Sequence, residues 1–270
     1  MAFKIGFMAN HGDGNNTDTY PAGRAAVQAR RSVVRVCFDE RNTTLSYYND
    51  RFDLHCGDIV YVDGKLEGLR GRVEEVNYNF KIKLSDYKRV VAVADTEVHG
   101  TFYMLGSHLV TFDRNTVPKE KIMTWYFPPQ KDDDELVSDN DGESFPLNEL
   151  SKMGISGAMA ERGCEYYTKN AVRYICMDGT RGYALVQGSK MYEVEFNCDA
   201  GQISNLTCSC YCTGKCKHDF AVMLQLAEAV EAIENNYSSL YESTQYFAAI
   251  VKYELLDCAL SGKEARSISL

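Results

Sequence analysis

Alternating hydrophobic and polar positions dominate the first half of the chain. Residues 33–38 (VVRVCF) and 57–76 (GDIVYVDGKLEGLRGRVEEV) are rich in β-branched residues, and Asp63–Gly64 is a typical hairpin turn. Further short runs with strand character occupy residues 78–84, 89–94, 101–105 and 108–112. Because no helical period of 3.6 residues occurs before residue 130, we expect residues 1–128 to form a small all-β barrel.

The second half of the chain changes from strands to helices. Alternation over residues 166–210, interrupted by turn signals such as Asp178–Gly179, predicts an antiparallel β-meander. Apolar residues then recur at helical spacing over residues 218–234, which predicts a helix packed on the meander. Residues 240–260 carry a second apolar stripe, and we interpret residues 237–270 as a C-terminal helical extension. The expected fold class is therefore α+β.

A strongly acidic stretch lies between these halves. The chain has 270 residues and a formal net charge of −9. Residues 131–150 hold one basic and eight acidic side chains, a net −7, so the flanking regions are close to neutral. We expect residues 129–150 to be a solvated linker between the barrel and a domain at residues 151–236. A dedicated nucleic-acid-binding domain is often basic overall, and neither region has that character.

The chain contains no apolar run of about 18 residues, the length that a membrane span requires. The first residues, MAFKIGFMANHGDG, turn polar too soon to form the core of a signal peptide. We therefore expect a cytoplasmic protein without a membrane partner. In that reducing compartment, clustered cysteines more often bind metal or act in catalysis than form disulfides.

Four of the ten cysteines fall within residues 208–218, CSCYCTGKCKH, between the meander and the helix. Cys208 and Cys210 are two residues apart, so their side chains point to the same side of a strand end. Cys216 and His218 fall where the helix begins and can turn back toward that pair. Three thiolates and one imidazole match a closed, tetrahedral site for one structural zinc ion, and an iron–sulfur cluster is the less favoured alternative.

The pattern C-x-C-x5-C-x-H at the start of an apolar helix resembles the SWIM-type zinc finger. Residues 184–196, ALVQGSKMYEVEF, also fit the V-x-G-S-x-x-Y-x-V context of that family. The resemblance covers residues 164–235 and implies a ββα-type finger with the ligands Cys208, Cys210, Cys216 and His218. SWIM fingers occur beside chromatin-remodelling-type ATPases, Mutator-type transposases and some ubiquitin ligases, and they are regarded as DNA-binding or protein-interaction modules.

Cys212 departs from the family pattern, in which proline or a polar residue is commoner inside the loop. This extra thiol is a possible alternative ligand that could replace a neighbouring cysteine. It could also be a redox-sensitive group or a spare thiol that the loop partly shields.

Residues 57–76 are similar to the start of SH3-like barrels of the KOW and Tudor type, which often bind nucleic acid or peptides. The motif is G-D-x-V-x-V followed by a glycine turn. The resemblance and the zinc cluster together suggest these nucleic-acid-binding residues: Arg70, Arg72, Lys81, Lys83, Tyr211, Lys215 and Lys217. Charged side chains also line solvent-facing strands without any ligand, and Glu74 and Glu75 interrupt the positive charge of the barrel set.

Signals of catalysis are missing from the sequence. It contains no P-loop, no dinucleotide-binding glycine motif and no nucleophile elbow. We therefore expect a protein that is not an enzyme, and two functional classes remain. The first is a nucleic-acid-binding accessory module that contacts DNA or RNA. The second is an adaptor that docks an enzyme, such as an ATPase or helicase, carried on another chain.

Overall fold

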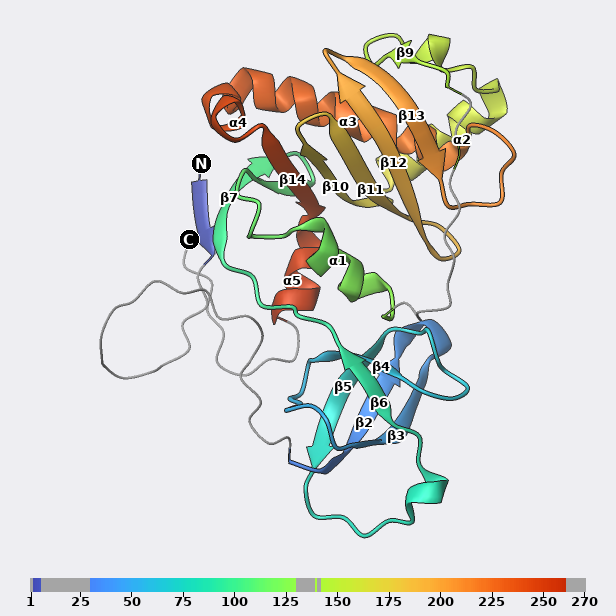
Figure 1. Ribbon diagram of the computed structural model, residues 1–270, viewed down its shortest axis with the longest axis vertical. Coiled ribbons are helices and arrows are strands. Elements are labelled where there is room, and N and C mark those ends of the chain that lie inside the picture. The colour runs from blue at the N-terminus through green and yellow to red at the C-terminus, as the bar shows by residue number, and fades with distance from the viewer. Residues whose placement is uncertain (1, 6–29, 130–138, 140–141, 261–270) are drawn as a thin grey trace.

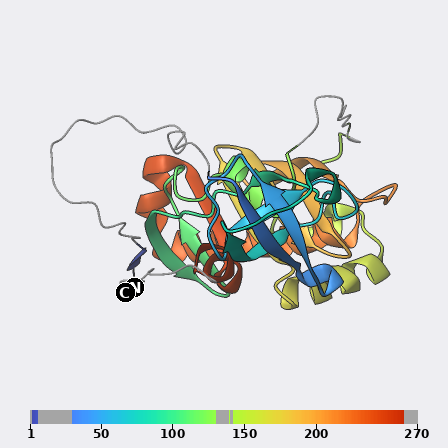
Figure 2. The ribbon, with the colours of Figure 1, turned by 90° about the horizontal axis from the view of Figure 1, so that it is seen from below.

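The computed structural model describes residues 2–5, 30–129, 139 and 142–260. This part of the chain is a mixed α+β structure with two antiparallel sheets and five α-helices. The sheets follow one another along the long axis of the molecule (Figure 1), and the smaller one is nearest to the viewer when the molecule is seen from below (Figure 2). None of the described helices combines the length and apolar character needed to cross a lipid bilayer.

The smaller sheet has five strands and contains most of the predicted N-terminal strands. In spatial order these are β3 (Thr43–Asn49), β2 (Ser32–Phe38), β5 (Gly71–Asn77), β4 (Ile59–Val62) and β6 (Val90–Val93). Gly71 lies where a Cβ atom would come within 2.4 Å of Val36, so only glycine lets these strands pack this closely.

The predicted barrel is not closed in this part of the chain. The outer strands β3 and β6 form no ladder with each other in the described residues, and an isolated parallel bridge joins Tyr48 of β3 to Arg89, the residue before β6. The strand expected at residues 78–84 is also wrong, because these residues form a loop that leads into a short 3₁₀ turn, Leu84–Asp86. Tyr78, Phe80 and Ile82 therefore alternate with polar residues without joining a ladder.

The larger sheet has nine strands and contains the predicted meander. In spatial order they are β1 (Ala2–Ile5), β7 (Gly100–Leu105), β8 (His108–Thr111), β14 (Tyr246–Val251), β10 (Val172–Asp178), β11 (Arg181–Gln187), β12 (Met191–Asp199), β13 (Gln202–Cys208) and β9 (Phe145–Pro146). Strands from all four of the predicted sequence ranges thus pair in one sheet. Half of the acidic stretch at residues 131–150, namely 131–138, 140 and 141, lies outside the described residues.

Both faces of the large sheet bury apolar side chains. On one face, Ala184 and Val186 pack against α3 (Lys217–Asn236), the predicted helix after the meander, and α2 (Gly157–Thr168) packs on α3. On the other face, Tyr183 and Leu185 pack against α1 (Lys119–Tyr126) and α5 (Lys252–Leu260). Figure 1 shows α3 running behind the meander. The meander is thus the middle layer of three.

Two elements differ from the sequence expectations. Helix α1 lies before residue 130, where no helix was expected, because its eight residues are too few to show a helical period. The apolar stripe at residues 240–260 is divided into α4 (Ser238–Thr244), strand β14 and α5 rather than forming one helix. All six residues of β14 are buried, as is typical of a central strand covered on both faces.

Candidate metal centre

The four predicted ligands come together at the junction between β13 and α3. Cys208 ends β13, and Cys216 is the residue that caps the N-terminus of α3. The ligand atoms of Cys208, Cys210, Cys216 and His218 all lie within 4.8 Å of one another. The cluster can therefore hold a metal ion.

The distances within the cluster suit tetrahedral coordination. Nδ1 of His218 lies 3.5 Å from Sγ of Cys216 and 3.7 Å from Sγ of Cys208. A zinc ion with ordinary Zn–S and Zn–N bond lengths places its sulfur and nitrogen ligands about 3.6 Å apart. Three thiols and an imidazole are also the donors that zinc accepts in closed sites. The donor set and its spacing are thus compatible with zinc.

Cys216 is fixed by the first turn of α3. Its backbone N–H donates to Oδ2 of Asp219 at 2.8 Å, and the Cys216 side chain accepts from the backbone N–H of Asp219, forming a capping box. Both residues are buried. The helix start therefore sets the position of one thiol without help from the other three ligands.

Aromatic rings fix the orientation of His218. Tyr192 stacks on the imidazole with ring centroids 4.4 Å apart, and the edge of Tyr166 packs at 5.3 Å. A Cβ atom at Gly188 would come within 2.8 Å of Tyr192 and 3.3 Å of His218 Nε2, so glycine makes room for this stack. The rings hold Nδ1 toward the thiols. The opposite nitrogen, Nε2, is buried and has no hydrogen-bond partner among the described residues.

The protonation of the cluster favours a cation at its centre. The pKa of the Cys216 thiol is raised, first by its hydrogen bond with Cys208 and then by burial. Burial raises the pKa of Cys210 to about 11. Burial also lowers the pKa of His218 to about 4, with a smaller effect of Lys217 in the same direction. A neutral imidazole can bind metal at once, and a dication lowers the pKa of thiols by stabilising their thiolates.

Cys212 lies outside the group of four. Its side chain is exposed, as are those of its neighbours Tyr211 and Thr213. It interacts with Cys210: a hydrogen bond with the Cys212 backbone lowers the pKa of the Cys210 thiol, and one with the Cys212 side chain has a smaller, raising effect. Its role as an alternative ligand stays a prediction.

The predicted nucleic-acid-binding residues fall into two groups. Tyr211 is 91% exposed at the tip of the finger loop, and Nζ of Lys217 lies 4.7 Å from the ring centroid of Tyr166 nearby. Lys215, in the same loop, forms an ion pair with Glu143 and its side chain is only 10% exposed.

The second group comes from the region of the small sheet, and its members differ: two arginines form ion pairs, and two lysines are exposed. Arg70 and Arg72 form ion pairs with Asp257 of α5, and Arg70 also lies 3.9 Å from Glu254. These two arginines therefore hold α5 against the small sheet. Lys81 and Lys83 are exposed in the loop after β5.

Sequence reasoning missed three contributors to this region. Asp219 forms the capping box at the start of α3, next to the ligands Cys216 and His218. An acidic residue three positions after a helix cap is a sequence signal for a capping box, so this role was predictable. Lys190 lies 5.4 Å from the ring centroid of Tyr211 and 5.5 Å from that of Tyr192. Tyr166 is far from the cluster in sequence, and nothing in its local pattern identifies it.

The resemblance to SWIM-type fingers rests on the motif and on the cluster that it forms. The ligand spacing, the strand before it and the helix after it are all present in the described part of the chain. Comparisons of the chain with protein family models, with characterised proteins and with solved structures find no match.

Proposed function

We propose that this protein is a non-catalytic accessory module that binds nucleic acid, and that a SWIM-type finger with one structural zinc ion orders its contact surface. The observation that carries the proposal is the cluster of Cys208, Cys210, Cys216 and His218. Four protein ligands complete a tetrahedral site, so no position is left open for a reacting water or substrate. The role of the metal is then to fold the loop.

The finger loop has little else to hold it in place. All four residues from Tyr211 to Gly214 are exposed, so burial of apolar surface does not stabilise this segment. Structural zinc supplies folding free energy in such small polar segments. A loop that is ordered by metal can present Tyr211 in one position instead of many.

The surface around Tyr211 favours a single-stranded nucleic acid as the partner. Its exposed ring, with Lys190 beside it and Lys217 on the first turn of α3, combines a stacking platform with positive charge. Base stacking on an aromatic ring next to cations is how many proteins bind single strands. Lys81 and Lys83, in the loop after β5, provide a second contact in this proposal, in keeping with the similarity of residues 57–76 to SH3-like barrels. Arg70 and Arg72 are left out, because α5 occupies them.

A protein adaptor is the alternative, and one observation favours it. Tyr253 and Leu256, two large side chains with apolar surface, are 48% and 40% exposed on the same short helix, α5. The rest of the apolar stripe that suggested this function is buried in β14 or against the sheet.

Binding of fluorescein-labelled single-stranded oligonucleotides, followed by anisotropy, tests the proposal. We expect Kd to rise steeply with salt, because phosphate contacts release counterions, and to rise about tenfold in Tyr211→Ala. Tyr253→Ala is the matched control, since it removes an exposed tyrosine far from the finger in the sequence. No binding at low salt, or equal losses in the two variants, would contradict the proposal.

A further inference from the structure

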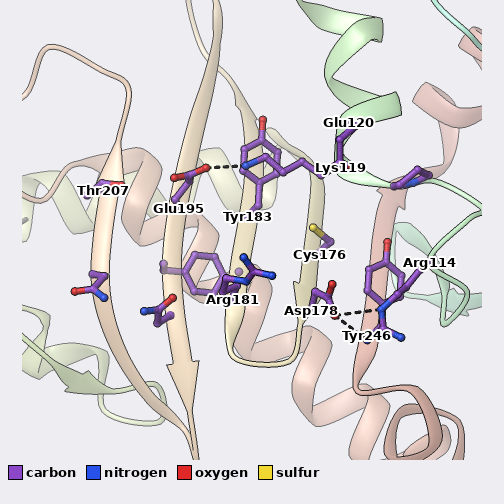
Figure 3. Close-up of a pocket in the computed structure, with 15 residues that line it drawn as sticks. Arg114, Lys119, Glu120, Cys176, Asp178, Arg181, Tyr183, Glu195, Thr207 and Tyr246 are labelled. Atoms are coloured by element: carbon purple, nitrogen blue, oxygen red, sulfur yellow. Dashed lines mark hydrogen bonds and ion pairs between the residues drawn. The ribbon is translucent and has the colours of Figure 1, made fainter. Parts of the chain in front are cut away.

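A cavity of about 650 Å³ lies on the face of the large sheet that carries α1, away from the zinc ligands (Figure 3). Strands β10 to β14 form its floor, and the start of α1 forms one rim. Its volume falls in the range of small-molecule sites. Nothing in the proposed function of the finger uses this cavity.

Part of the cavity wall is held in place by ion pairs. Arg114 pairs with Asp178 at 2.7 Å, and Lys119 pairs with Glu195 at 2.7 Å. Nζ of Lys119 also lies 3.9 Å from the ring centroid of Tyr183. Each of these cations already has a carboxylate partner. The ion pairs therefore fix the side chains in this part of the wall and leave it without net charge.

Four polar side chains at the other part of the cavity have no such partners. They are Arg181, Asn197, Asn205 and Thr207. Within the described residues, no hydrogen bond or ion pair engages the side chain of any of the four. Glu120 is the remaining charged group of the lining, and it lies on α1, whereas Arg181 begins β11 beside the β10–β11 turn. Arg181 is thus the one charged side chain of this end without an ion-pair partner among the described residues, since its cross-strand neighbour Asp178 is engaged by Arg114.

An irregularity in β13 helps to build this end. The pairing with β12 shifts between Glu195, opposite Thr207, and Asn197, opposite Ser204, so β13 has an extra residue there. Asn205 lies in this bulge with φ of 51°, a left-handed conformation that asparagine tolerates better than most residues. Bulges of this kind re-aim side chains next to binding sites, and here Asn205 and Thr207 both line the cavity.

We propose that this cavity binds a small organic anion through its carboxylate or phosphate group. The guanidinium of Arg181 offers paired donors that match the oxygens of either group. The two asparagine amides and the threonine hydroxyl complement hydroxyl or amide substituents of the same molecule. The inference is independent of zinc, because none of these residues is a metal ligand.

Titration of the zinc-loaded full chain, followed by ¹H–¹⁵N NMR at constant ionic strength, tests this site. The probes are inorganic phosphate and malate, and sodium chloride serves as the blank. We expect saturable shifts of the amides of Arg181, Asn197 and Asn205 with at least one probe. Tighter binding of one probe identifies the source of the anion. Absence of saturable shifts with both probes overturns the proposal.

Two variants identify the residues responsible. Arg181→Gln should weaken probe binding at least tenfold, whereas Arg41→Gln, which removes an exposed arginine from the small-sheet region, should leave it unchanged. Asn205→Gly keeps a residue that accepts positive φ while it removes the amide, and it should weaken binding about threefold. Equal affinity in the wild type and in Arg181→Gln, with both proteins folded by their spectra, rejects the site.

Discussion

Two junctions in this molecule are built mainly from polar side chains, and they use different chemistry. The finger junction joins β13 to α3 through three thiols and an imidazole. The second, which we call the arginine junction, joins the small sheet to α5 through Arg70 and Arg72 with Glu254 and Asp257. The first gathers three thiols, which repel one another as thiolates, and a neutral imidazole, whereas the second gathers opposite charges.

The comparison shows at which junction the protein's own side chains satisfy one another's charges and hydrogen bonds. At the arginine junction, Glu254 accepts a hydrogen bond from Tyr126 at 3.1 Å and lies 3.5 Å from Arg173. Ile59 adds apolar contact from the small sheet to the core beside α1 and α5. At the finger junction, by contrast, burial raises the pKa of Cys210, and among the described residues the cluster consists of three thiols and an imidazole without a cationic side chain. We therefore expect the finger to need a bound metal ion for its stability, whereas the arginine junction supplies its own opposite charges.

The largest expected effect comes from removing a buried ligand. Cys216→Ala deletes one zinc ligand and the cap of α3, so we expect loss of bound zinc and a fall of more than about 3 kcal/mol in the free energy of unfolding. Metal content by mass spectrometry and urea denaturation measure the two effects. Cys164→Ser, at an exposed thiol on α2, should retain zinc and change stability by less than about 0.5 kcal/mol. Zinc retained by Cys216→Ala shows that the ligand assignment is wrong.

A smaller effect is expected from the residue that supports a ligand without binding metal. Asp219→Asn weakens the hydrogen bond from the Cys216 backbone, and we expect zinc affinity to fall about tenfold. Competition with a zinc-binding dye measures the affinity. Asp199→Asn changes an exposed carboxylate at a turn and should have no effect. Equal affinities for the two variants indicate that the capping box does not position the thiol.

His108 provides a polar group that belongs to neither junction. It is fully buried, its Nε2 lies 2.8 Å from the carbonyl oxygen of Val172, and burial lowers its pKa. The folded state therefore binds this proton less readily than the unfolded state, so stability falls as the pH drops below the ordinary value of about 6.5. Between pH 7.5 and 5.5, we expect the wild type to lose about 1 kcal/mol more than His108→Gln. Urea denaturation at both pH values checks this, and equal losses contradict it.

The smallest effect should come from one ion pair of the arginine junction. A double-mutant cycle with Arg72→Gln and Asp257→Asn isolates the coupling between these side chains, which we expect to be about 0.5 kcal/mol. Asp257 is half exposed, so 0.5 M salt should reduce the coupling further. A coupling above about 2 kcal/mol, or one that salt does not change, means that the pair is shielded from solvent and that the two junctions are more alike than we infer.

The local features of this protein were predictable from the sequence. The spacing of Cys208, Cys210, Cys216 and His218 predicts a cluster because a strand end and a helix start fix the directions of their side chains. The meander and α3 have periods long enough to recognise. Features that depend on contacts between residues far apart in the sequence could not be predicted from local patterns. β14 resembles a helix in sequence, and only its place between β8 and β10 makes it a strand.

The same distinction applies to the sites. Arg70 and Arg72 look available for phosphate in sequence, and α5, almost two hundred residues later, occupies them. The cavity with Arg181 and Asn205 has no sequence motif, because its residues come from separate strands and from a bulge in β13. Side chains that meet only through sheet pairing carry no local signal.

The central place of β14 has a consequence for how the chain folds. Strands β1, β7 and β8 on one side and the meander on the other are joined within the sheet only through residues 246–251. During synthesis, β8 and β10 therefore each present an unpaired edge until the chain has grown past residue 251. Exposed strand edges are sites of intermolecular pairing, and pairings this distant in sequence form slowly. The two parts of the large sheet can therefore join only after residues 246–251 have been synthesised.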